Sequence, residues 1–173
     1  MRSVIRAATP GQTRRALCVG INSYPTSPLA ACVRDAQTWA TTLRGLAFDT
    51  TVLLDREATR QRVLDALNDL IDSARAGDSL VFQYAGHGTQ AEDLNGDEAD
   101  RYDEALVPID YTSGALLLDD DLADVYRRLP AGAVLTLFMD CCHSGTNSRF
   151  APIDRTPPRS DERRRFLQLT RVL

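Results

Sequence analysis

Apolar residues in this sequence occur in two patterns, which together predict an alternation of strands and helices. Short apolar runs bounded by turn residues are typical of buried strands, and apolar positions three or four residues apart predict amphipathic helices. The first pattern predicts strands at residues 16–21, 50–54, 79–84 and 133–139, with a short strand or hairpin arm at 105–109. The second predicts helices at residues 28–45, 59–74 and 119–129. This order predicts an α/β domain with a mostly parallel, doubly wound sheet between helices.

The segments outside this pattern divide the chain into three regions. Residues 1–15 are polar and predict an N-terminal arm, and residues 16–150 form the predicted domain. Residues 91–101 are acidic and poor in apolar residues, which predicts a loop inside that domain. Residues 151–173 are rich in arginine and proline and show no further strand pattern. They are expected to be a tail or linker.

The composition is typical of a soluble globular protein and argues against several classes of function. The hydrophobic fraction of 43% and the charged fraction of 25% are ordinary for a packed domain. The net charge of −4 gives no reason to expect nucleic-acid binding. No apolar run has the length of a membrane span, and the first residues lack the apolar segment of a signal peptide. The four cysteines have no C-x-x-C spacing, so we expect a reduced, cytoplasmic protein.

Two polar stretches that follow predicted strands carry the candidate chemistry. Residues 84–90 read Tyr-Ala-Gly-His-Gly-Thr-Gln, and residues 140–145 read Asp-Cys-Cys-His-Ser-Gly. In open α/β sheets, catalytic groups gather beyond the carboxyl ends of the strands. His87 can approach a cysteine from another strand, whereas His143 follows Cys142 directly, and neighbouring side chains of an extended chain point apart. The two stretches therefore predict a cysteine nucleophile with His87 as its base.

The same residues also allow simpler roles. A lone histidine is more often structural than catalytic, but Gly86 and Gly88 leave room around His87 at a strand end, which favours catalysis. A metal protein that uses His87, Cys141, Cys142 and His143 is a weaker alternative. Adjacent cysteines fit a tetrahedral zinc site poorly.

Together the two stretches resemble the metacaspases, which belong to the caspase-like superfamily of cysteine peptidases. His87 and Cys142 are 55 positions apart, similar to the spacing of about 50 residues in caspases. The resemblance covers roughly residues 16–150 and implies a caspase-like fold. It also implies Cys142 as the nucleophile and His87 as its partner, with Cys141 as a small filler. The backbone N–H groups of Gly88 and Cys142 are candidates for the oxyanion hole.

The resemblance further implies cleavage after arginine or lysine. The residues that bind the basic side chain in metacaspases map onto Asp35 and Cys32, which lie in one segment, and onto Asp140. Carboxylates bind a guanidinium through charge-assisted hydrogen bonds. Without the resemblance, Asp35 on a predicted helix would be interpreted as a solvated surface residue. Ala85 stands where relatives often carry serine, so this side chain offers no polar contact to the pocket.

The acidic loop after His87 resembles a metacaspase loop and implies a calcium site. Residues 93–104 match an EF-hand only in part, because Glu98 occupies the position of the required glycine. Many metacaspases bind calcium through aspartates that map near Asp103, Asp119 and Asp120, and such oxygen ligands suit Ca²⁺. The simpler alternative is that Asp119 caps a helix and the others are solvated. No organic cofactor is expected.

Complete caspase-like sheets contain further strands in a small-subunit-like region after the catalytic cysteine. Here 31 residues follow Cys142, and they include the arginine-rich residues 155–165. We expect a calcium-stimulated, self-processing cysteine endopeptidase that cleaves proteins or peptides after basic residues, with no nucleic-acid or membrane partner. A small-subunit-like segment or another chain could pair with the sheet edge. The alternative is a non-enzymatic interaction module with an incomplete cleft.

Overall fold

The computed structural model of the protein describes residues 11–92, 102–142 and 166–168. Its strands are β1 (Arg14–Gly20), β2 (Asp49–Leu54), β3 (Ser79–Glu92), β4 (Tyr102–Leu106), β5 (Leu117–Leu118), β6 (Val134–Cys142) and β7 (Phe166–Gln168). Its helices are α1 (Cys32–Gly45), α2 (Arg60–Asp72) and α3 (Asp119–Tyr126). Two short 3₁₀ turns lie at Asp55–Glu57 and Tyr111–Ser113.

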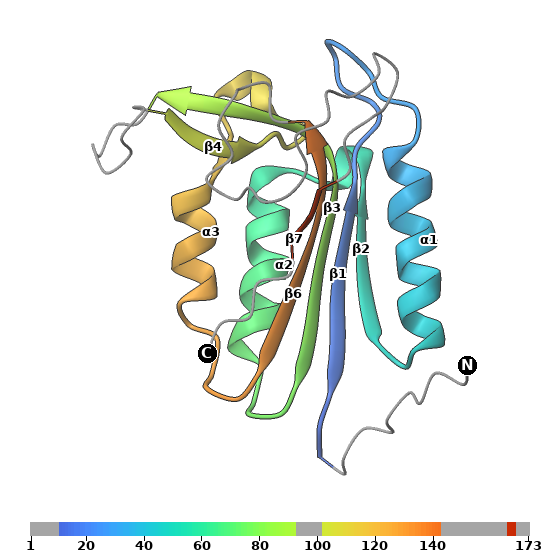
Figure 1. The fold of residues 1–173 in the computed structure, drawn as a ribbon. Coiled ribbons are helices and arrows are strands. Elements are labelled where there is room, and N and C mark those ends of the chain that lie inside the picture. The colour runs from blue at the N-terminus through green and yellow to red at the C-terminus, as the bar shows by residue number, and fades with distance from the viewer. Residues whose placement is uncertain (1–10, 93–101, 143–165, 169–173) are drawn as a thin grey trace, which may run out of the picture.

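Four parallel strands in the order β2-β1-β3-β6 form the centre of the sheet. β7 pairs antiparallel with β6, while β4 and β5 form an antiparallel ribbon on the last residues of β3. Helix α1 covers one face of the sheet, and α2 and α3 cover the other (Figure 1). The structure thus confirms the predicted α/β class and the mostly parallel sheet between helices.

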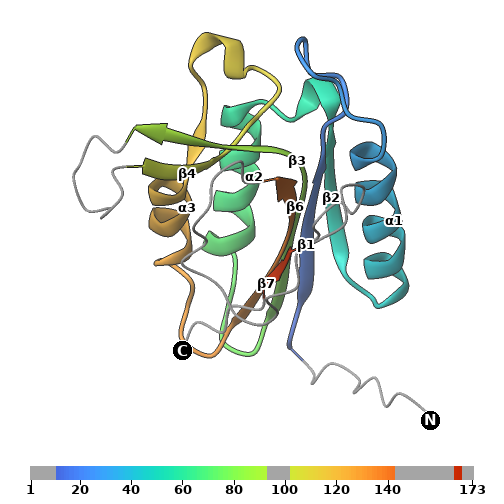
Figure 2. The same ribbon diagram turned by 45° about the horizontal axis from the view of Figure 1, so that its top comes forward.

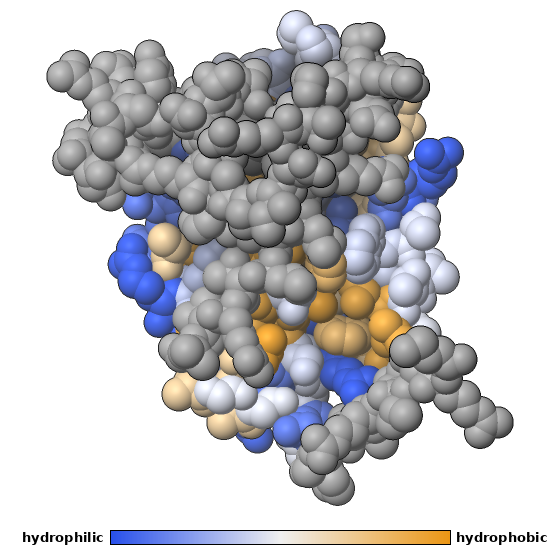
Figure 3. Space-filling model, viewed as in Figure 1, coloured by the Kyte–Doolittle hydropathy of each residue, from blue (hydrophilic) through white to orange (hydrophobic). Residues whose placement is uncertain are grey.

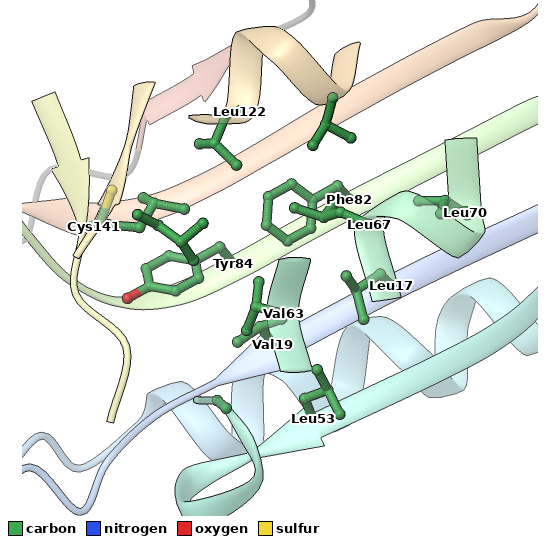
Figure 4. Close-up of a cluster of buried hydrophobic side chains, with 14 of the residues drawn as sticks. Leu17, Val19, Leu53, Val63, Leu67, Leu70, Phe82, Tyr84, Leu122 and Cys141 are labelled. Atoms are coloured by element: carbon green, nitrogen blue, oxygen red, sulfur yellow. The ribbon is translucent and has the colours of Figure 1, made fainter. Parts of the chain in front are cut away.

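The larger hydrophobic core lies between the sheet and helices α2 and α3 (Figure 4). Alternate residues of the strands point into it, so that Leu17, Val19 and Phe82 are at most 1% exposed. Helix α2 contributes the predicted stripe, of which Val63, Leu67, Leu70 and Ile71 are buried. Thr59 caps this helix as predicted, because its side chain accepts a hydrogen bond from the Arg62 N–H at 3.3 Å.

Strand β3 is longer than predicted and changes its partners along its length. It does not end at Tyr84 but runs to Glu92, pairing with β6 as far as His87 and with β4 from Gly88 onward. Figure 2 shows β3 bending away from the parallel strands toward β4. The glycine-rich stretch that was expected to follow the strand is therefore extended backbone at the point where the strand changes partners. Pairing with β4 is a tertiary effect that the local sequence pattern does not reveal.

Three other boundaries differ from the predicted ones. Helix α1 begins at Cys32 rather than at residue 28, because the preceding residues form a loop in which the Leu29 N–H donates to the Asn22 carbonyl at 2.8 Å. Strand β4 covers residues 102–106 instead of 105–109. Strand β6 continues through Cys142, so both cysteines lie within the strand and not in a turn after it.

The prediction that no strand follows residue 150 is wrong. Residues 166–168 form β7, which pairs with Leu137, Phe138 and Met139 of β6. A strand of three residues next to an arginine-rich segment is too short to show a hydrophobic period. β7 therefore covers part of the sheet edge that was expected to be open to another chain.

Helix α1 covers its face of the sheet chiefly over β1, β2 and β3. It also contacts β6 through a ring pair, Trp39 against Phe138, with centroids 4.2 Å apart. Beyond it, Val134 at the start of β6 is 44% exposed. In the view of Figure 1, the space-filling picture shows hydrophobic side chains at the surface, between segments drawn in grey (Figure 3). None of the helices in the described part of the chain is long and apolar enough to cross a membrane.

The buried carboxylate of Asp78, at the end of the sheet opposite to His87 and Cys142, makes the stability of the fold depend on pH. Asp78 is 2% exposed and accepts hydrogen bonds from the Thr13 N–H at 2.7 Å and the Arg75 N–H at 2.9 Å. The Thr13 bond is the main cause that lowers the pKa of Asp78, although burial opposes it, and Arg15 lies 3.6 Å away. Because the folded state favours the carboxylate, Asp78 stabilises the fold above its unfolded pKa. That stabilisation is lost as the pH falls through the folded pKa.

We therefore expect Asp78→Asn to lower the free energy of unfolding by about 2 kcal/mol at pH 7, since the charged acceptor of two backbone donors is lost. Urea unfolding at several pH values measures this. The difference from the wild type should shrink below about pH 4, where Asp78 of the unfolded wild type is itself protonated. A difference that stays constant from pH 7 to pH 3 would contradict the assignment.

Candidate active site

The register of the parallel strands brings the two predicted catalytic residues together. His87 of β3 is paired with Cys142 of β6, so the backbones of the two residues lie side by side in the sheet. Neighbouring strands are about 4.8 Å apart, which is within reach of a histidine and a cysteine side chain. The side chain of Cys142 lies outside the described residues. The backbone alone thus places the candidate nucleophile next to its candidate base.

The other three cysteines are buried. Cys18 is 0% exposed, Cys141 is 4% exposed and Cys32 is 9% exposed. Burial raises the pKa of the Cys18 thiol to about 12, although the charge of Arg44 opposes this, so Cys18 is not ionised near neutral pH. Cys141 belongs to the hydrophobic core and lies at one end of the cluster in Figure 4. Its predicted role as a small core residue agrees with this position.

His87 is oriented by the loop between β1 and α1. Its Nε2 lies 2.7 Å from the backbone oxygen of Ser27, which can only accept a hydrogen bond. Nε2 must therefore carry the proton, and Nδ1 is the nitrogen left for proton exchange with a thiol. Ser27 has a positive φ of 59°, an uncommon conformation for a residue other than glycine. Nothing in the sequence pattern identified Ser27, because its contribution is a backbone carbonyl.

A second carboxylate holds this loop in place. Oδ1 of Asp55, which follows β2, accepts hydrogen bonds from the N–H groups of Asn22 at 2.7 Å and Ser23 at 2.9 Å. The Asn22 side chain in turn accepts from the N–H of Val33 in the first turn of α1 at 3.2 Å. The loop that carries the Ser27 carbonyl is thereby tied to β2 and to α1.

A row of residues on the α1 face relates the predicted basic-residue pocket to the catalytic pair. Gly20, Ala85 and Asp140 are register partners on β1, β3 and β6, two residues before the level of His87 and Cys142. Helix α1 packs closely over this row, because a Cβ on Gly20 would lie 2.5 Å from the Cys32 oxygen. Asp35 is in the first turn of the same helix. The fold thus brings Asp35 and Asp140 to the same face and the same end of the sheet.

The two candidate oxyanion-hole groups also lie at this end. Gly88 follows His87 directly and is paired with Leu106 of β4, while Cys142 is the last residue of β6. Their backbones are therefore adjacent to the catalytic pair. Their role in binding an oxyanion stays a prediction.

The predicted metal ligands come from two segments that the ribbon of β4 and β5 brings together. Ala105 of β4 is paired with Leu118 of β5, so Asp103, two residues earlier, lies near the start of α3, where Asp119 and Asp120 are found. Leu118 is the N-cap of helix α3, and its N–H donates at 3.2 Å to the carboxylate of Asp121, which also pairs with Arg60 at 2.7 Å. Asp119 is thus not the capping residue.

Among the side chains that the structure describes, no three from His, Cys, Asp or Glu are grouped closely enough to hold a metal ion. The side chain of Asp103 lies outside the described residues, so only two of the three predicted calcium ligands, Asp119 and Asp120, have described side chains. Carboxylate oxygens are the ligands that Ca²⁺ prefers, and the β4–β5 register places all three aspartates near one another. The type of donor therefore suits calcium, and the calcium site stays a prediction.

A cysteine and a histidine that are register partners on neighbouring parallel strands are the arrangement expected of a cysteine peptidase on an α/β sheet. The family model "Metacaspase, peptidase C14 domain" matches residues 14–149. The chain belongs to the metacaspase family of cysteine peptidases. This confirms the family that the two motifs indicated.

Individual relatives agree with this assignment. Metacaspase-1 of Cryptococcus neoformans is 41% identical over 145 residues, which cover 77% of this chain and 32% of that protein. Metacaspase-2 of Trypanosoma brucei brucei is 38% identical over 150 residues, which cover 79% of this chain and 43% of that protein. The match thus spans 32% to 43% of the length of these relatives.

A solved structure shows the same fold. The crystal structure of protein GSU0716 from Geobacter sulfurreducens is similar to this chain with a TM-score of 0.70 and 33% sequence identity. The match covers 78% of this chain and 52% of that one.

Proposed function

We propose that this chain is the catalytic part of a cysteine endopeptidase that cleaves peptide bonds after arginine or lysine. The observation that carries the proposal is the register pair of His87 and Cys142, at the point where the pairing of β3 with β6 ends. Family membership supports the reaction class. The row that ends in Asp140, below an α1 helix that carries Asp35, supports the preference for a basic side chain.

The catalytic step follows from the tautomer of His87. The Ser27 carbonyl holds the proton on Nε2, so Nδ1 accepts the Cys142 thiol proton and gives a thiolate–imidazolium pair. The thiolate attacks the peptide carbonyl, the C–N bond breaks, and Nδ1 returns its proton to the leaving amine. Water then attacks the thioester with His87 as general base, which releases the acid and restores the thiol.

The charge of the pocket determines the preferred substrate. Two carboxylates on one face of the sheet attract a guanidinium or ammonium group and repel the aspartate side chains that caspases recognise. Ala85, between Gly20 and Asp140 in the sheet, leaves the floor of this pocket small and apolar. Long side chains such as arginine can lie on such a floor and place their charge between the carboxylates.

Calcium is proposed as an activating ion held by Asp103, Asp119 and Asp120. Bound there, Ca²⁺ would neutralise carboxylates at the junction of β4 and α3. β4 pairs with the part of β3 that follows His87, so this junction is connected to the catalytic strand. Self-processing within residues 155–165 is proposed from their arginine content, and this segment lies outside the described residues.

The test is cleavage of fluorogenic peptides that end in arginine or in aspartate, with and without millimolar calcium. We expect cleavage after arginine only, stimulated by calcium and abolished in Cys142→Ala. Asp140→Asn should lower kcat/KM for the arginine peptide by at least about 100-fold, because a charged acceptor is lost from a specific site. Intact mass after calcium addition tests processing. No turnover of either peptide would favour the non-enzymatic interaction module.

A further inference from the structure

Both backbone polar groups of His87 are bound by partners outside the pairing of β3 with β6. The His87 N–H donates to the hydroxyl of Tyr24 at 3.0 Å. The His87 carbonyl accepts from the hydroxyl of Tyr84 at 2.9 Å and from the N–H of Val107 at 3.1 Å. His87 is thus fixed by side-chain hydroxyls at the point where β3 changes its partner from β6 to β4.

The two tyrosines form one buried unit. Tyr24 is 3% exposed and Tyr84 is 0% exposed, and their hydroxyl oxygens are 3.3 Å apart. The Tyr24 hydroxyl also lies 2.8 Å from the Val107 carbonyl, to which it can donate. Each hydroxyl has one hydrogen. All the groups are satisfied when Tyr24 donates to Val107 while accepting from His87, and Tyr84 donates to the His87 carbonyl.

The ring of Tyr24 also contacts the imidazole itself. The two ring centroids are 4.5 Å apart with an angle of 49° between the planes. Ser27, which accepts from Nε2, lies three residues further along the same loop. One loop therefore sets three properties of His87, namely the position of its backbone, the position of its ring and its tautomer.

The tyrosine unit explains why a glycine precedes His87. A Cβ on Gly86 would lie 2.6 Å from the Tyr24 hydroxyl and 2.7 Å from the Tyr84 hydroxyl. Carbon and oxygen atoms do not approach so closely without displacement of one of them. Gly86 has no positive φ, so the requirement for glycine here comes from the space that the two hydroxyls occupy.

We propose that Tyr24 is a positioning residue for the catalytic histidine, acting through its hydroxyl on the His87 backbone and through its ring on the imidazole. The proposal rests on the proposed function of His87 as the base of Cys142. Tyr24 contacts neither the substrate nor the nucleophile in this role. Its effect is to keep Nδ1 at the distance and angle that proton transfer needs, for which displacements of an ångström matter.

The ionisation of Tyr24 agrees with this role. Burial raises the pKa of its hydroxyl to about 12, although the hydrogen bonds with Tyr84 and His87 oppose the effect. The hydroxyl therefore stays protonated throughout the range in which a cysteine peptidase works. It can donate to Val107 and accept from His87 at the same time.

The experiment compares Tyr24→Phe with Tyr126→Phe in the full chain. Tyr126, on α3, is a matched control, because its buried hydroxyl has no hydrogen-bond partner in the described part of the protein. Two quantities are measured: the rate at which iodoacetamide alkylates Cys142, by peptide mass mapping, and kcat and KM for an arginine peptide. Circular dichroism and melting curves confirm that each variant is folded at the assay temperature.

We expect Tyr24→Phe to lower the alkylation rate and kcat about tenfold, with KM unchanged within a factor of about two. Tyr24→Leu, which also lacks the ring, should lower both about 100-fold, and Tyr126→Phe should match the wild type. Alkylation does not need peptide turnover, so it tests Tyr24 even if the chain cleaves no peptide. A folded Tyr24→Phe variant alkylated at the wild-type rate would overturn the proposal, whereas absent turnover with Tyr24-dependent alkylation would overturn only the proposed function.

Discussion

Replacing His87 by alanine is expected to lower peptide cleavage by at least about 1,000-fold and to slow the alkylation of Cys142 at neutral pH. In the proposed mechanism the imidazole is both the base that ionises the thiol and the acid that protonates the leaving amine, and a positioned acid–base group contributes about 10² to 10⁴ in rate. The two effects should appear together, because both depend on Nδ1. Turnover of an arginine peptide and mass mapping of alkylated Cys142 measure them.

The other histidine is the natural control for this prediction. His143→Ala should keep most of the alkylation rate, because His143 is the sequence neighbour of Cys142 and neighbouring side chains of an extended chain point apart. A His87→Ala variant that is alkylated as fast as the wild type would contradict the pairing of His87 with Cys142. The same variant with turnover intact would identify a different base.

The parts of the fold that could be predicted are those in which local sequence and tertiary packing agree. The stripe of α2 has a clear helical period, and its members Val63, Leu67 and Ile71 are buried in the structure. Thr59 before that helix is a standard capping residue and caps it. The catalytic candidates could be predicted because the two strands that precede them needed only to be neighbours, as consecutive strands usually are.

The parts that could not be predicted depend on contacts between distant segments. The continuation of β3 past Tyr84 depends on pairing with β4, and β7 depends on the edge of β6. Tyr24 and Ser27 act on His87 from 63 and 60 residues away. A tyrosine next to a proline has the pattern of a turn residue, and a backbone carbonyl leaves no trace in the sequence. Second partners of catalytic residues are therefore the least visible part of this site.

Helix α1 packs so closely on strand β1 that a substitution between them is expected to have a large effect on stability. Gly20 of β1 lies under this helix, where a Cβ would be 2.5 Å from the Cys32 oxygen and 2.7 Å from the Ala36 Cβ. The nearest atom belongs to the backbone and cannot rotate away. Gly20 has no positive φ, so its backbone conformation would suit alanine, and the added Cβ would be opposed only by the clash with the helix.

Gly20→Ala is therefore expected to lower the free energy of unfolding by about 3 kcal/mol, at the upper end of the range for overpacked sites. Gly45→Ala is the matched control, since Gly45 ends the same helix and a Cβ added there would have no other atom within 4 Å. That variant should be as stable as the wild type or up to about 1 kcal/mol more stable, because alanine favours helix. Urea unfolding of the three proteins measures both differences.

The same substitution tests how the basic-residue pocket is assembled. Relief of the clash at Gly20 requires α1 to move away from β1, and Asp35 lies in the turn of α1 between Cys32 and Ala36. Folded Gly20→Ala protein should then bind arginine peptides more weakly, with a KM raised by about tenfold, because a displaced carboxylate no longer meets the guanidinium. Loss of stability with an unchanged KM would show that Asp35 does not contact the substrate. An unchanged stability would mean that α1 does not pack on β1 as closely as the structure has it.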